Sequence, residues 1–367
     1  MPTPEDLSRL MQSSTRPRFT VAGREEPSLA NDAVLVQIDE DIDGLQRLAA
    51  QFIAIGTVPG ATSEAFQYLD GRLLDFGTEV KVGMGPSESQ ATLFTGKVSA
   101  IELDLHEGRA PEVLFLAEDR LMDLRMTRRF KTYEDASDAD LLQQIAAQHG
   151  LRAQADVSGP RLNVVQQWNQ SDLAFLRERA RRLGADVWVD NDTLRMASRD
   201  QRPGPRLTLV QGRDLVQLTA SADLAHQRSE VQVGGFDDVQ AERIDERAAA
   251  DVVAPEVQGQ THGLQVLQRA FGSRTSHRVR EVPLKGEDAR AWARATLLTR
   301  ARRFVQVRGV AQGSTELRVG AVLRLERVSP MFEGDGYYVT RVRHTFDLER
   351  GYRTQFEAER AWIGQGG

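Results

Sequence analysis

The sequence predicts a β-rich α+β protein with two related antiparallel β-barrels, a helical and mixed middle module, and an insert in the second barrel. Three observations predict this architecture. Alternating apolar residues dominate the first and last thirds of the chain, helical spacing dominates the middle third, and two long strand-patterned stretches repeat each other. The length of 367 residues also favours several cores, because single cores stop growing at roughly 250–300 residues.

Strand patterns fill the first third of the chain after a polar start. Alternation begins at Val34, and the spacing around Leu45 and Ala49 predicts a short helical turn. Strand pattern then restarts at Phe52. Further strands are predicted, between turns rich in Gly, Pro and Ser, at residues 79–84, 92–105 and 112–117.

Helical spacing replaces strand pattern in the middle third. Ser137 is followed three residues later by an acidic residue, which predicts a capped helix that ends at Gly150. A second helix is predicted from Ser171 to Gly184. The turn residues 190–192 between two apolar runs then predict a hairpin.

Strands return after the Pro- and Gly-rich boundary at 202–205. Residues 237–285 are poorly periodic, and a helix is predicted at 286–304. We expect the following domains: a tail at 1–18, a first β-barrel at 19–120, an α+β middle module at 121–204, a second β-barrel at 205–236 and 303–362, an insert with a helix at 237–302, and a tail at 363–367.

An internal repeat is the strongest feature of the sequence. A shift of 241 residues places 98–118 on 339–359, with a Gly-containing turn at the same place in both. Any two hairpins share a period of two, which is the alternative explanation. Three such chains would present six similar modules, which indicates a structural adaptor rather than a catalyst. The matching pairs are Val98 with Val339, Ile101 with Val342, Phe115 with Phe356, Ala117 with Ala358, and Glu118 with Glu359.

The composition excludes several classes of function. Cysteine is absent, so disulfides, thiol nucleophiles and cysteine metal sites are excluded. The net charge of −6 argues against general nucleic-acid binding. The sequence shows no apolar run of about 18 residues and no signal peptide, so we expect synthesis in the bacterial cytoplasm and no membrane insertion by this chain.

Motifs that suggest chemistry fail on inspection. The acidic stretch 39–44 begins like a calcium loop but has Arg47 and Ala50 where oxygen ligands are needed. Lys97 lies in an incomplete phosphate-loop pattern, and the six histidines lack zinc-site spacing. We therefore predict no catalytic, cofactor-binding or metal-binding residues and no enzyme activity.

Aromatic and basic residues are the remaining candidates for a site. Trp168 and Trp188 are expected in the core. An interface between proteins is enriched in Trp and Arg. The candidate anchors for such an interface are Trp292, Trp362, Arg300 and Arg303.

Three stretches of the sequence resemble the phage late control protein D family. They are 119–150, with a Tyr-Glu-Asp-Ala-Ser segment leading into a helix, 167–189, and the closing stretch 334–344. This family comprises the baseplate hubs of contractile phage tails and the hub part of VgrG-type spike proteins in type VI secretion and related contractile injection systems.

The resemblance implies a fold, a function and partners. It implies two tail-tube-like barrels and a homotrimer that joins the hexameric tail tube to a spike. Because the sequence given ends at Gly367, we expect the spike to be a separate protein. The implied partners are the tail tube protein, this spike protein and baseplate wedge proteins, within a phage virion or injection particle. A cell-wall hydrolase or glycan-binding module of a tail is the alternative function.

Overall fold

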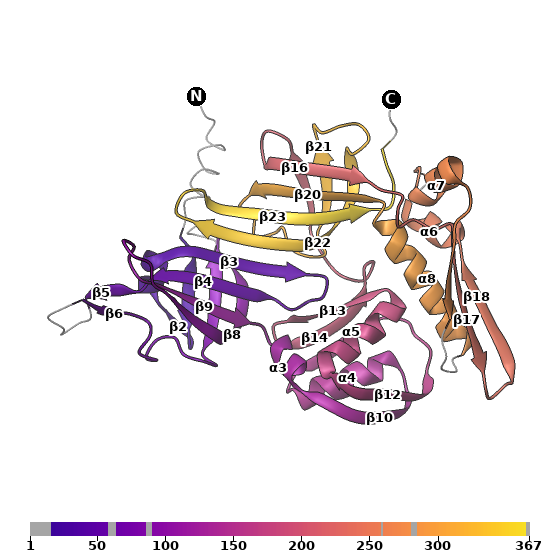
Figure 1. Ribbon diagram of the computed structural model, residues 1–367, viewed down its shortest axis with the longest axis horizontal. Helices are drawn as coiled ribbons and strands as arrows, with labels where there is room; N and C mark the ends of the chain where they lie inside the picture. Colours follow the sequence, from indigo (N-terminus) through magenta and orange to yellow (C-terminus); the bar gives the residue numbers. More distant parts are fainter. Residues whose placement is uncertain (1–15, 58–63, 86–89, 258–259, 280–284, 365–367) are drawn as a thin grey trace.

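Apolar side chains at every second position form the strands of both terminal thirds of the protein. The computed structural model describes residues 16–57, 64–85, 90–257, 260–279 and 285–364. Figure 1 shows two layers of long strands one above the other, helices α3–α5 below them, and α6–α8 with β17 and β18 beside them. Four hydrophobic cores lie in these parts. The predicted β-rich α+β class is confirmed.

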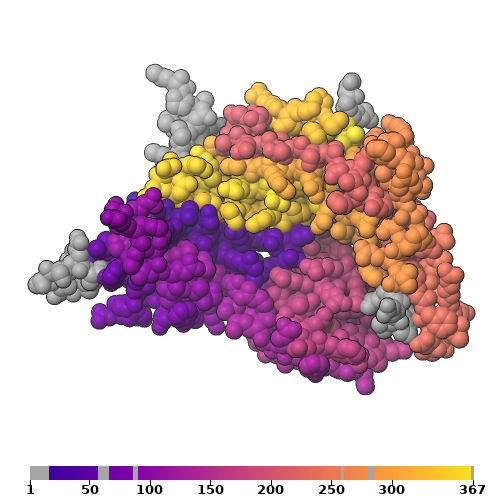
Figure 2. Space-filling model, viewed as in Figure 1, coloured from indigo at the N-terminus to yellow at the C-terminus, as the bar shows by residue number. Residues whose placement is uncertain are grey.

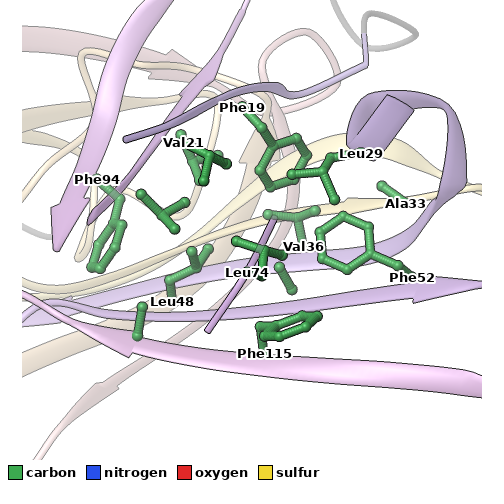
Figure 3. Close-up of a cluster of buried hydrophobic side chains, with 14 of the residues drawn as sticks. Phe19, Val21, Leu29, Ala33, Val36, Leu48, Phe52, Leu74, Phe94 and Phe115 are labelled. Atoms are coloured by element: carbon green, nitrogen blue, oxygen red, sulfur yellow. The ribbon is translucent and has the colours of Figure 1, made fainter. Parts of the chain in front are cut away.

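The N-terminal strands form a rolled sheet in the order β3-β4-β9-β8-β7-β1-β2. Figure 3 shows Phe19, Phe52 and Phe115 converging on one core under α2. Strands from both ends of this order share that core. The elements are β1 (Arg18–Val21), β2 (Arg24–Glu25), α2 (Pro27–Asp32), β3 (Ala33–Asp41), β4 (Arg47–Ile53), β7 (Glu79–Met84), β8 (Ala91–Asp104) and β9 (Glu112–Glu118), with a separate pair of β5 (Ile55–Thr57) and β6 (Glu64–Phe66).

The C-terminal strands form a second sheet in the order β16-β20-β23-β22, with β21 on the far side of β22 and β15 beside β21. Val305, Val339 and Phe356 lie in its core, together with Leu209 and Leu215. The core therefore receives strands from both ends of the order, as in the first sheet. The elements are β15 (Arg206–Val210), β16 (Leu215–Ala222), β20 (Val305–Gln312), β21 (Val322–Glu326), β22 (Gly334–Asp347) and β23 (Gly351–Arg360).

The two sheets are one continuous sheet of 13 strands, because β22 also pairs with β3. Among the described residues this sheet is open, and its two ends are β2 and β16. Closure of each half into a barrel therefore stays a prediction. No described helix is long and apolar enough to cross a membrane.

The predicted repeat is confirmed by the strand registers. Val98 pairs with Ala117, and Val339 pairs with Ala358 at the same place in the other hairpin. Each hairpin then has a bulge of one residue, at Ser99 and at Thr340. The hydroxyl of Ser99 donates to the Leu116 carbonyl (3.3 Å), and that of Thr340 donates to the equivalent Glu357 carbonyl (3.2 Å). Shared period alone does not produce the same bulge with the same hydrogen bond.

The middle module has a core between two helices and two small sheets. Ser137 caps α4 in a capping box with Asp140, and Ser171 caps α5, which ends at Gly184 in the left-handed conformation, as the sequence predicts. The elements are α3 (Leu121–Met126), β10 (Arg128–Ala136), α4 (Asp138–Gln148), β11 (Arg152–Asp156), β12 (Leu162–Ser171), α5 (Asp172–Leu183), β13 (Ala185–Asp190) and β14 (Thr193–Ser198).

The insert has its own core, in which α8 packs on a three-stranded sheet. Residues 230–236, expected in the second barrel, lie instead in β17, which pairs with β18 and β19 of the insert. Val231 and Val233 of β17 are buried against this core, which is why the strand belongs there. The elements are β17 (Glu230–Asp237), β18 (Glu242–Ala248), α6 (Ala250–Val257), α7 (Gly263–Phe271), β19 (Thr275–Val279) and α8 (Gly286–Arg302).

Two predictions about local structure need correction. The helical turn expected near Leu45 and Ala49 is wrong, because Ala49 lies inside β4 and pairs with Gln37 of β3. Leu48 and Ala49 are adjacent apolar residues in β4, which lies between β3 and β9, and adjacent apolar residues interrupt the alternation expected of a strand. The poorly periodic segment 237–285 contains two strands, β18 and β19, which pair with opposite edges of β17, and two helices. The expected tails fall largely outside the described residues, at 1–15 and 365–367.

Candidate functional site: the joint between the two sheets

The joint is the antiparallel pairing of β3 with the second half of β22, from Arg341 opposite Asp41 to Asp347 opposite Leu35. The Ile42 N–H extends it by donating to the Thr340 carbonyl (2.9 Å). The first half of β22 pairs with β21 of its own sheet. One strand thus belongs to both sheets.

Apolar packing crosses the joint in both directions. Phe346 and Tyr352 of the second sheet lie in the core of the first, and Ile42 of the first packs against the core of the second. An ion pair of Arg343 with Asp39 (2.8 Å) lies across the pairing. The two sheets are therefore joined by strand pairing, by apolar packing and by an ion pair at the same place.

A buried arginine fastens the middle module to this joint. Arg202 has a side chain that is 4% exposed, and it lies 3.2 Å from Glu40 of β3 and 3.5 Å from Asp186 of β13. Its guanidinium also stacks over Trp188 at 4.2 Å from the ring centroid. Arg202 therefore touches the first sheet and the middle module at once.

A second, partly buried arginine continues the network into the other sheet. Arg199 pairs with Glu359 of β23 and lies over the ring of Tyr338 of β22, 4.4 Å from its centroid. The Tyr338 hydroxyl donates to Asp186 (3.4 Å). Burial disfavours the charge of Arg199, but the neighbouring Glu359 carboxylate raises its pKa overall. The network thus reaches all three core regions that meet at the joint.

Buried carboxyl groups at the joint carry raised pKa values. Burial raises the pKa of Glu40 and that of Asp186, although Arg202 opposes both shifts. Burial also raises the pKa of Asp119 to about 7, although N–H groups of Gln46 and Leu121 donate to this carboxylate. At neutral pH the joint therefore contains acidic groups whose ionisation opposes folding.

The raised pKa of Asp119 predicts a loss of stability as the pH rises. An unfolded aspartate titrates near 3.9, so between about pH 4 and about pH 7 the folded protein keeps a proton that the unfolded chain has released. This stabilising term is complete below about pH 4 and is lost as the pH rises through about 7. Asp119→Asn is expected to reduce the loss of unfolding free energy between pH 5 and pH 8 by about 2 kcal/mol, measured by urea denaturation.

The difference in pH dependence between the unchanged protein and Asp119→Asn reports on the Asp119 carboxyl group alone, because all other titrating groups are shared. Burial lowers the pKa of His344 to about 3, which acts in the opposite direction, since stability is then lost as the pH falls below about 6.5. Asp238→Asn on the exposed surface is the matched control. Equal slopes for the parent and Asp119→Asn would contradict the assignment.

Figure 2 shows the C-terminal strands, in yellow, lying directly on the N-terminal strands, in indigo. A cleft of about 510 Å³ beside the joint is lined by both signs of charge. Its charges largely pair with one another, as in Arg181 with Asp43 at 2.9 Å and Arg308 with Glu357 at 3.8 Å. A cleft with internally paired charges does not suit a strongly charged ligand. Among the described residues no group of three or more His, Asp or Glu side chains is placed to hold a metal ion.

The predicted interface anchors do not form one site. Trp292 and Trp362 are partly buried against the core of the insert, and Trp362 also lies against Gly336 and under Arg360. Arg300 is partly buried, and burial lowers its pKa. Arg303 alone reaches the cleft, where it is half-exposed and lies 3.8 Å from Glu359. Their role as anchors stays a prediction.

The two other tryptophans differ from each other. Trp188 is buried as expected, under Arg202. The core position expected for Trp168 is wrong, because this side chain is 69% exposed and lies opposite Phe130, which is 79% exposed. Val165 and Gln167 of β12 are buried, so the alternation of this strand places Val164, Gln166 and Trp168 on the outer face.

Sequence reasoning missed the residues of the buried network. Arg202 stands in the Arg-Pro-Gly-Pro stretch, whose composition indicates an exposed linker. The stretch is instead packed, since a Cβ on Gly204 would lie 2.1 Å from the Gly320 carbonyl oxygen. The one sequence feature that could have indicated a buried arginine was Trp188, because the ring of a buried tryptophan can stack against a guanidinium group.

Solved structures of phage tail proteins share this arrangement of sheets and modules. The 43 kDa tail protein of prophage MuSo2 from Shewanella oneidensis has a TM-score of 0.69 at 10% identity, over 94% of this chain and 98% of its own. The tail protein from Neisseria meningitidis has 0.66 at 12% identity, over 95% and 97%. An Escherichia coli component of the type VI secretion system, described as similar to the T4 tail proteins gp27 and gp5, has 0.55 at 11% identity, over 92% and 76%.

The fold is therefore that of phage tail and type VI secretion proteins, and the predicted resemblance to tail hubs is confirmed at the level of the fold. By sequence, the chain belongs to the Alg8 N-terminal domain family, whose model matches residues 23–347. No curated protein matches the sequence.

Proposed function

We propose that the protein is the structural baseplate hub of a contractile phage tail or of a related contractile injection system. The observation that carries this proposal is the duplication within one chain. The strand pairs β4-β9 and β20-β23 match residue for residue, as do β9-β8 and β23-β22. Because each chain carries two equivalent sheets, a ring of three chains can match a ring of six subunits of another protein.

The duplication explains how a trimer would act as an adaptor. Three chains provide six equivalent sheets, which fit a hexameric tail tube on one side, while the middle modules and inserts keep a threefold arrangement for a spike on the other. Closure of the sheets into two tube-like barrels belongs to this proposal, as do the domain boundaries given above, with residues 230–236 assigned to the insert. So do the separate spike protein, the tube protein and the baseplate wedge proteins as partners.

The buried network at the joint supports a mechanical role. Arg199 and Arg202 connect both sheets to the middle module through largely buried charges, which solvent and salt screen less than exposed ones. Such a connection holds three parts in fixed relative positions, which a load-bearing adaptor needs. We infer that the chain is a structural tail component without enzyme activity, made in the cytoplasm and incorporated into the particle.

The mass of the purified protein in solution tests the proposal. Native mass measurement at micromolar concentration is expected to give three times the chain mass of 40.9 kDa. Images along the symmetry axis are expected to show six similar lobes around a central opening. A folded monomer would contradict the proposal, and cell-wall hydrolysis in a zymogram would replace it with an enzymatic role.

A further inference from the structure

Two strand edges without a partner lie at opposite ends of the repeated unit. β16 is the last strand of the main sheet order, and among the described residues its outer edge is met only at Leu215, by an isolated bridge with Gln211. β8 pairs with β7 only as far as Lys97, so residues 100–104 have a neighbour only in β9. Edges of this kind bind other strands readily.

The repeat relates these two edges to the joint within the chain. In sheet order β16 is the counterpart of β3, and β8 is the counterpart of β22. The bulge between Ala33 and Leu35 recurs between Leu215 and Gln217, at a constant shift of 182 residues. β3 pairs with β22 inside the chain. The equivalent pairing of β16 with β8 is absent from a single chain.

We propose that β16 of one copy of this chain pairs with residues 101–105 of a second copy, in the antiparallel register of the joint. This inference rests on the proposed trimer and specifies how its chains meet. Ile38 lies opposite His344 in the joint. The same register places Ala220 opposite Leu103 of the next chain, and Leu218 opposite Leu105.

The exposure of the side chains supports this pairing. Leu103 is 46% exposed and Leu105 is 58% exposed, whereas their counterparts in the joint, His344 and Phe346, are each 4% exposed. Val216 beside the other edge is 50% exposed. Apolar residues on an unpaired edge are a liability in a monomer, and the proposed contact would cover them as the joint covers its own.

The geometry also selects the occupant. The two edges belong to different strands, so the contact between copies is head-to-tail and each copy offers one edge to each neighbour. Each added copy leaves one edge free for the next copy, so head-to-tail contacts add chains until the ring closes. A second copy is therefore the partner that both edges fit, and it repeats a pairing that this chain already makes with itself.

Cysteine cross-linking in the full-length protein tests the register, because the sequence contains no cysteine of its own. Leu103→Cys with Ala220→Cys, and separately Asp104→Cys with Thr219→Cys, place sulfurs on directly opposite residues. Neighbouring pairs alternate between the two antiparallel spacings, so the two variants sample both. Mild oxidation is expected to give covalent species of two and three chain masses on a denaturing gel.

The slipped pair Leu103→Cys with Thr219→Cys is the matched control, since a shift of one residue puts the side chains on opposite faces. It is expected to give at least fivefold less cross-linked product. A trimer that cross-links equally in all three variants, or in none, would overturn this inference and leave the proposed hub intact. A monomer would contradict both.

Discussion

Arg202→Ala is expected to lower the free energy of unfolding by about 3–5 kcal/mol, because it leaves two buried carboxylates without their partner. The guanidinium lies 3.2 Å from Glu40 and 3.5 Å from Asp186, and its side chain is 4% exposed. Unfolding of the purified variant and of the unchanged protein in guanidinium chloride measures this difference in free energy. The loss of unfolding free energy is expected to be larger at pH 8 than at pH 5. Burial raises the pKa of both carboxyl groups, so without Arg202 a lower pH favours their neutral forms, which need no cationic partner.

An exposed arginine gives the matched control. Arg324 pairs with Asp335 at 2.7 Å, but its side chain is 47% exposed. Arg324→Ala is therefore expected to change the free energy of unfolding little, because exposed ion pairs contribute little to stability. Adding Glu40→Gln and Asp186→Asn to Arg202→Ala is expected to recover part of the loss, since no unpaired charge then remains buried. A loss of equal size in the two arginine variants would contradict the role of the network.

Gly44→Ala is expected to be the most damaging single substitution in the turns around the joint. Gly44 has a φ of +87°, and an added Cβ would lie 1.9 Å from the Val187 carbonyl oxygen of the middle module. The strained φ costs about 1–2 kcal/mol, and the clash with backbone adds about 1–3 kcal/mol. Denaturant unfolding of the variant measures the sum.

Gly108→Ala separates the two contributions. Gly108 has a φ of +78°, but nothing lies within 4 Å of an added Cβ. This control is expected to show the conformational cost alone. Similar losses in the two variants would mean that the turn after β3 does not need its close approach to β13. A larger loss for Gly44→Ala would show that this approach holds the middle module in place.

The sequence supports the repeat and the capped helices because both depend on local patterns. Identical residues at a constant shift predicted the two hairpins, and Ser137 and Ser171 predicted their helices. These signals are contained in short windows of sequence. The β-rich class and the helix at 286–304 follow for the same reason.

The joint could not be predicted, because it depends on contacts between distant segments. No local pattern says that β22 pairs with β3 or that Arg202 is buried between them. The prediction for Trp168 fails because the buried face of β12 carries the polar Gln167, so apolar character alone selects the wrong face of the strand. Long-range pairing and the choice of which strand face is buried are the two sources of error here.

The double membership of β22 has a mechanical consequence. Its first half is bonded to β21 and its second half to β3, with no loop between the halves. A displacement of either sheet must therefore travel along one covalent backbone into the other, since a hinge would need a flexible segment at that point. Relative motion of the two sheets would therefore require β22 itself to bend, because no linker between them is available to flex.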